Sequence, residues 1–104
     1  MHRKTFAMFV NPTHQEEHQK RHDEIGDEMK NILQTHGVHN YSIHLFAEQN
    51  LLFGYAEVES DEQWAAISQT EVCQKWWAYI KDITPSNEDN SPISKSLKEF
   101  FYLE

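Results

Sequence analysis

The segment NPTHQEEHQKRHDEIGDEMKNILQTHG, residues 11–37, decides the fold of this chain because it predicts one long helix. Asn11 followed by Pro12 is typical of an N-cap and the first helical residue, and Gly37 is typical of the residue after a helix end. Apolar residues recur between them at helical spacing, namely Ile25, Met29, Ile32 and Leu33. This stripe predicts that the helix packs against the rest of the molecule.

Toward the N-terminus, the apolar face of this helix becomes a row of histidines, His14, His18 and His22. At about 100° per residue, all three lie within about 60° of Ile25 around the helix axis. One interpretation is that the first two turns overhang the sheet and are solvated. A metal site is the sharper alternative, since histidines at i, i+4 share one side of a helix. Three in a straight row are poorly placed to surround one ion, so we expect no metal.

Strands are predicted on both sides of this helix. Residues 3–10 carry apolar side chains on both faces, which is typical of a strand covered on both sides. Residues 39–46 place Tyr41 on one face with Ile43 and Leu45. Because the polar turn at residues 47–50 is only of hairpin length, the strand predicted at 51–59 should pair antiparallel with 39–46.

The second half of the chain predicts two helical segments and a last strand. Residues 60–63 fit a capping box and open a short helix. A second helical segment starts at Thr70 and ends before Pro85, and Trp76 belongs to its apolar stripe with Trp77 alongside. Residues 86–92 predict a surface loop, and the apolar residues 97–103 predict a final strand. Gly26, inside the long helix, marks a bend or a close approach, or is a tolerated defect costing about 1 kcal/mol against alanine.

The order strand, helix, strand, strand, helix, strand predicts an α+β, ferredoxin-like βαββαβ domain spanning residues 1–104. Such a domain has an antiparallel four-stranded sheet with the helices on one face. Because the strands are apolar on both faces, the other face needs a cover, and a homodimer packed sheet against sheet would supply it.

Composition narrows the classes of function. A hydrophobic content of 38% argues against disorder, and a net charge of −8 argues against a nucleic-acid partner, which would need a basic patch. No apolar run approaches the roughly 20 residues that span a bilayer, and the apolar run at the N-terminus is too short for a signal peptide. Cys73 is the single cysteine, which excludes a disulfide framework. We therefore expect a cytoplasmic protein without a membrane partner.

Three sets of side chains should face one space between the sheet and the helices. These are the histidine row, Tyr41 and the tryptophans Trp76 and Trp77. Ordinary core is the alternative for Trp76, but two adjacent tryptophans cannot both point inward on a narrow stripe. His22 lies nearest the apolar part of the stripe, so it is the candidate for proton transfer near neutral pH. Aromatic faces beside such a group suit a sugar, with one apolar C–H face and hydroxyls at its rim.

Ten short segments, in one order along the chain, carry a resemblance to a known family: Arg3-Lys4, Val10-Asn11-Pro12, Arg21-His22, His36-Gly37, His39-Asn40-Tyr41, Asn50-Leu51-Leu52-Phe53, Val72-Cys73-Gln74, Trp76-Trp77, Asp89-Asn90-Ser91-Pro92 and Phe101-Tyr102-Leu103. In these segments the chain resembles the L-rhamnose mutarotases across essentially its whole length. The resemblance implies a dimeric α/β barrel and a cytoplasmic isomerase that interconverts the α and β anomers of L-rhamnose without metal or cofactor.

The resemblance also implies roles for particular residues. His22 would be the proton donor, and Tyr41, Trp76 and Trp77 would contact the sugar. The family usually has tyrosine four residues before the catalytic histidine, where it also contacts the sugar, and here that residue is His18. Two other functions fit the same fold: a non-catalytic module that binds a sugar or small metabolite, and a haem or oxygen-using relative with a histidine as axial ligand.

Overall fold

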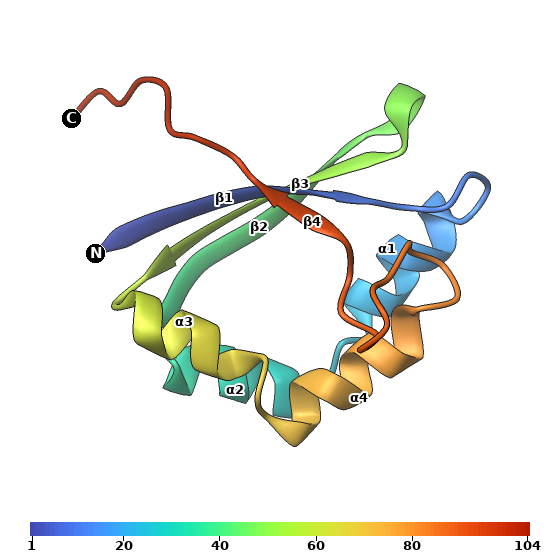
Figure 1. Ribbon diagram of the computed structural model, residues 1–104, viewed down its shortest axis with the longest axis horizontal. Helices are drawn as coiled ribbons and strands as arrows, with labels where there is room; N and C mark the ends of the chain where they lie inside the picture. The colour runs from blue at the N-terminus through green and yellow to red at the C-terminus, as the bar shows by residue number, and fades with distance from the viewer.

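The computed structural model describes residues 1–104 as a four-stranded antiparallel sheet with four α-helices on one face (Figure 1). The elements are β1 (His2–Phe9), α1 (Gln15–Asp23), α2 (Asp27–Thr35), β2 (Val38–Phe46), the 3₁₀ turn η1 (Ala47–Gln49), β3 (Leu51–Val58), α3 (Asp61–Ile67), α4 (Glu71–Ile80) and β4 (Ser94–Ser96). The strand order β2-β3-β1-β4 confirms the predicted ferredoxin-like α+β arrangement. None of the helices combines the length and the apolar character needed to cross a membrane.

The prediction of one continuous helix over residues 11–37 is wrong, because the chain breaks at Gly26 into α1 and α2. The backbone of Gly26 has a φ of 86°, a conformation that glycine adopts without a steric cost. The predicted start is also wrong, since Thr13 has a φ of 75° and the first helical residue is Gln15. Asn11 does not cap the helix; its side-chain amide donates to the carbonyl oxygen of Asp82 at 3.2 Å. The direction of α1 is therefore set separately from that of α2.

The sheet presents alternate residues of each strand to the helices. In β3, Leu52, Gly54, Ala56 and Val58 are buried, while the residues between them are half-buried. Since β1 pairs with β3 so that Phe6 faces Gly54, the ring of Phe6 lies on the same side of the sheet. The core beneath the helices comprises Met29, Val38, Ala56, Val58, Ile67 and Cys73.

An irregularity in β2 turns Tyr41 toward the helices. The pairing of β2 with β3 shifts register between His39 and Ser42, and Asn40 has a φ of 50°. A β-bulge of this kind adds one residue to one strand of a pair. As a result, Val38 and Tyr41 both pack on the helix side of the sheet although they are three residues apart, which a regular strand with a period of two does not allow.

The final strand was predicted in the wrong place. The strand is Ser94–Ser96, which pairs with Phe6–Met8 of β1, and residues 97–103 form no strand. The chain returns to the sheet at Ser94–Ser96, so these polar residues meet the free edge of β1. Pairing with β1 makes them a strand although their own strand propensity is low. The residues beyond β4 run on the face away from the helices (Figure 1), where Arg3 binds Glu99 at 2.7 Å and lies 3.7 Å above the ring of Tyr102.

Candidate active site

A cavity of about 1150 Å³ opens between the sheet and the helices. Its walls come from the helix-side face of β1, β2 and β3, from the four α-helices, and from the segment after α4. The volume exceeds the roughly 300–1,000 Å³ typical of small-molecule sites. The predicted site residues His18, His22, Tyr41, Trp76 and Trp77 all line this cavity.

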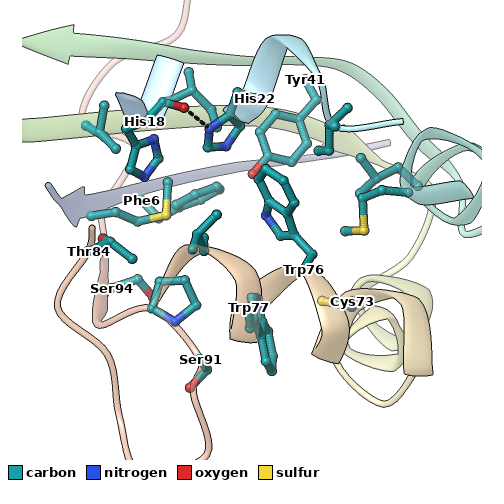
Figure 2. A pocket seen from close by; sticks show the side chains of 18 of the residues that line it. Phe6, His18, His22, Tyr41, Cys73, Trp76, Trp77, Thr84, Ser91 and Ser94 are labelled. Carbon is teal, nitrogen blue, oxygen red and sulfur yellow. Dashed lines mark hydrogen bonds between the residues drawn. The ribbon is translucent and has the colours of Figure 1, made fainter. Parts of the chain in front are cut away.

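Two histidines of α1 form a stacked pair at the cavity wall (Figure 2). The rings of His18 and His22 lie with centroids 4.7 Å apart and planes 16° from parallel, as their i, i+4 spacing permits. His18 is only 5% exposed, and His22 is half-buried. The Nδ1–H group of His22 donates to the backbone carbonyl oxygen of His18 at 3.1 Å. This bond fixes the ring of His22 and leaves its Nε2 as the atom available to a ligand.

Burial disfavours the charged form of both imidazoles. It lowers the pKa of His18 to about 4, and the nearby charges of His22 and Arg21 act in the same direction. Burial also lowers the pKa of His22, against the opposing effects of the His18 carbonyl and the Asp23 carboxylate. A neutral imidazole carries one N–H donor and one lone pair, so each ring can take part in proton transfer.

The third member of the histidine row does not join this site. His14 is the N-cap residue of α1, its backbone N–H donates to the carbonyl oxygen of Asn11 at 3.0 Å, and it does not line the cavity. Its Nδ1 is buried without a hydrogen-bond partner. No set of three histidine, cysteine or acidic side chains is arranged to hold a metal ion.

Tyr41 reaches the cavity from β2 over an aromatic floor. Its ring meets Phe6 edge to face at 6.2 Å and Trp64 at 6.1 Å between centroids. Phe6 in turn depends on Gly54, since a Cβ at that position would overlap the Phe6 ring. Burial raises the pKa of Tyr41 to about 12, so its phenol remains protonated and can donate a hydrogen bond. No sequence pattern marks Phe6 or Gly54 as supports of the site.

The tryptophans come from α4, which is capped by the side chain of Thr70 accepting the backbone N–H of Cys73 at 3.2 Å. Trp76 meets His22 edge to face, with centroids 5.1 Å apart and planes at 81°. Trp77 is directed away from His22 and lines another part of the cavity (Figure 2). Both indoles are half-buried.

An arginine next to His22 fastens α1 to the end of α4. Arg21 donates from Nη1 to the carboxylate of Asp82 and to the carbonyl oxygen of Tyr79, both at 2.7 Å. Its Nε donates to Glu17 at 2.9 Å. These bonds hold the helix that carries His22 against the helix that carries Trp76. Arg21 has no periodic signal in the sequence, although Arg21-His22 is one of the segments that carry the family resemblance.

The segment after α4 was predicted to be a surface loop, yet part of it lines the cavity. Its contributing residues are Asn87, Ser91 and Pro92, followed by Ser94 and Ser96 of β4. Ser91 is held within its turn by the carboxylate of Asp89, which accepts from its hydroxyl at 2.5 Å. The only indication in the sequence that this segment lines the cavity is the family resemblance, which includes Asp89-Asn90-Ser91-Pro92.

The family model described as L-rhamnose mutarotase matches residues 3–103. The chain belongs to the L-rhamnose mutarotase family. It is 53% identical over 102 residues to the L-rhamnose mutarotase of Pectobacterium carotovorum subsp. carotovorum, with 98% of each chain covered. It is 52% identical over 101 residues to that of Shigella flexneri serotype 5b, with 97% of each chain covered.

Solved structures agree with this family. The crystal structure of an L-rhamnose mutarotase from Formosa agariphila has a TM-score of 0.92 and 36% identity, with 100% of both chains covered. A dimeric ferredoxin-like protein from an uncultured marine organism has a TM-score of 0.59 at 15% identity, with 97% of this chain and 96% of that chain covered. The second likeness shows the fold alone.

Proposed function

We propose that this protein is an isomerase that interconverts the α and β anomers of L-rhamnose in rhamnose metabolism. The observation that carries the proposal is the family match over residues 3–103, the family being named for this activity. The chemistry of the cavity supports it, because a half-buried imidazole stands there among aromatic side chains. Because the matching family is named for an isomerase activity, the match also favours an enzyme over a module that only binds sugar.

His22 is the proton donor in this proposal. Ring opening needs a proton on the ring oxygen and the loss of one from the anomeric hydroxyl. Since the Nδ1–H of His22 is engaged by the carbonyl oxygen of His18, a protonated His22 donates from Nε2. A positioned acid of this kind contributes typically 10²–10⁴-fold. Rotation about the C1–C2 bond of the open aldehyde and reclosure then give the other anomer, and no step calls for a metal or a cofactor.

The sugar is held by His18, Tyr41, Trp76 and Trp77. The indole faces would cover an apolar C–H face of the sugar. The neutral phenol of Tyr41 and the buried ring of His18 supply hydrogen bonds to hydroxyls.

The test is the exchange between the two anomer signals of L-rhamnose in saturation-transfer NMR. The protein should speed this exchange at catalytic concentrations. Calorimetric binding of the sugar with exchange no faster than in buffer would instead support the sugar-binding module, and a Soret band in the purified protein would support a haem-binding relative.

We also propose that the protein is a cytoplasmic homodimer. The open face of the sheet carries the half-buried rings of Phe9, Phe53 and Tyr55, which favour a cover. Beyond β4, the neighbouring side chains of Phe100 and Phe101 are 97% and 78% exposed. Adjacent exposed aromatic side chains favour a contact with another protein surface. The single buried thiol of Cys73 fits a reducing compartment.

A further inference from the structure

Ring opening needs a proton acceptor as well as a donor, and the cavity offers few candidates. The titratable residues that line it besides His18 and His22 are Lys4, Asp23, Lys30, Tyr41, His44 and Cys73. Tyr41 and Cys73 stay protonated, because burial raises the pKa of the phenol to about 12 and that of the thiol to about 11. A lysine ammonium group has three donors and no lone pair.

The other two candidates are turned away from His22. Asp23 is exposed and follows His22 in α1, so it lies about 100° further around the helix. His44 is exposed, pairs with Phe53, and its Nε2 lies 3.1 Å from the hydroxyl of Ser42. His18 remains, stacked on the donor itself.

We propose that His18 is a second catalytic residue, which accepts the proton of the anomeric hydroxyl while His22 protonates the ring oxygen. The inference rests on the proposed mutarotase activity. The two oxygens are bonded to the same carbon, so the groups that handle their protons must be neighbours. The stacked rings, with centroids 4.7 Å apart, meet that requirement, and Figure 2 shows the free end of the His18 ring directed into the cavity.

Stacking also sets the protonation states that the reaction needs. Two imidazolium ions at this distance repel each other, so the pair holds only one proton beyond the N–H of each neutral ring. The charge of His22 lowers the pKa of His18, which is also lowered by burial and by Arg21. For His22 the His18 carbonyl and the charge of Asp23 act against burial. The proton therefore resides on His22, and His18 keeps its lone pair.

The proton balance closes over one turnover. His22 gives its Nε2 proton to the ring oxygen, the bond from C1 to that oxygen breaks, and its electron pair stays on the oxygen. The anomeric hydroxyl gives its proton to His18 as the C1=O double bond forms. On reclosure from the other side of C1, His18 returns a proton to the carbonyl oxygen and His22 recovers one from the ring-forming hydroxyl. The two rings together carry one extra proton, and so one positive charge, throughout. No new charge is therefore created in the buried site.

This role depends on the imidazole at position 18. The family usually has tyrosine at the position of His18, and a phenol with a pKa near 10 is no base at neutral pH.

The first experiment compares anomer exchange of L-rhamnose by the parent and by His18→Gln, which keeps a polar side chain but no base. We expect kcat to fall by about 10²-fold or more, with a much smaller change in KM. The parent's rate should decline below about pH 4, where His18 becomes charged, and this decline should be absent in the variant. His14→Gln, a change in the same histidine row outside the cavity, is the matched control and should keep the parent's profile.

A second measurement does not depend on how the variant folds. A ¹⁵N-NMR titration of the parent's histidine rings should show His22 taking up a proton at higher pH than His18. The inference is overturned if His18 protonates first, or if a folded His18→Gln variant keeps the parent's kcat and acid limb. An inactive parent would instead reject the proposed function.

Discussion

Replacing His18 with phenylalanine should make the protein more resistant to acid. In the folded state burial, assisted by the charges of His22 and Arg21, lowers the pKa of His18 to about 4, against about 6.5 in an unfolded chain. Between these pH values the unfolded state binds a proton that the folded state does not. Stability therefore falls as pH falls through this window. At about 1.4 kcal/mol per pKa unit, the parent should lose about 3 kcal/mol on this account by pH 4. Phenylalanine keeps an aromatic ring beside His22 and loses nothing from this source.

The assay is urea unfolding followed by tryptophan fluorescence at several pH values from 7 to 4. One fixed protein concentration is used, because the stability of the proposed dimer would depend on it. The change in packing shifts the variant's curve by a constant, so the informative quantity is the difference between the two curves as pH changes. Carboxylates and His22 titrate in both proteins and cancel to first order. Parent and variant curves that run parallel from pH 7 to pH 4 would refute a buried, neutral His18.

Three further substitutions test the supports of the site and the open sheet face. Gly54→Ala should displace the Phe6 ring, lower the free energy of unfolding by about 1–3 kcal/mol and weaken sugar binding; an unchanged melting temperature would contradict this contact. Arg21→Lys should lose hydrogen bonds to the carboxylate of Asp82 and to the carbonyl oxygen of Tyr79, destabilising the fold by about 1–2 kcal/mol and lowering kcat. Parent-like kinetics would show that these bonds do not position His22. Phe53→Glu, on the face away from the helices, should convert a dimer into monomers in sedimentation equilibrium, and a persistent dimer would place the interface elsewhere.

The sheet and its order followed from the sequence because apolar alternation and a short polar turn restrict strand pairing to few arrangements. The long helix was mispredicted at the two residues whose backbones leave the helical region, Thr13 and Gly26. Gly26 was noted as a candidate bend, but a glycine within an amphipathic segment also fits an unbroken helix. Thr13 gives no signal of its own, since positive φ is uncommon for a β-branched residue.

The prediction of the last strand was wrong for a different reason. Residues 97–103 have the stronger strand propensity, whereas Ser94–Ser96 are the ones that meet the free edge of β1. Local composition does not contain the position at which the chain returns to the sheet.

The site was predictable where helical spacing alone decides it, as for His18 and His22 on one face of α1. The same spacing wrongly extended the row to His14, because α1 begins only at Gln15. Groups that act through tertiary contacts, namely Phe6 over Gly54 and Arg21 with Asp82, had no periodic signal.

The most direct test of His22 as the proton donor is the rate of anomer exchange of L-rhamnose with the parent and with His22→Ala. The rate is measured by saturation-transfer NMR on proteins whose folding is checked by circular dichroism. The surface variant His39→Ala, which removes only the contact with Glu59, is the control. This role of His22 predicts acceleration by the parent and by the control, and a loss of about 10²–10⁴-fold in the His22 variant. A folded His22→Ala protein that exchanges the anomers as fast as the parent would contradict it.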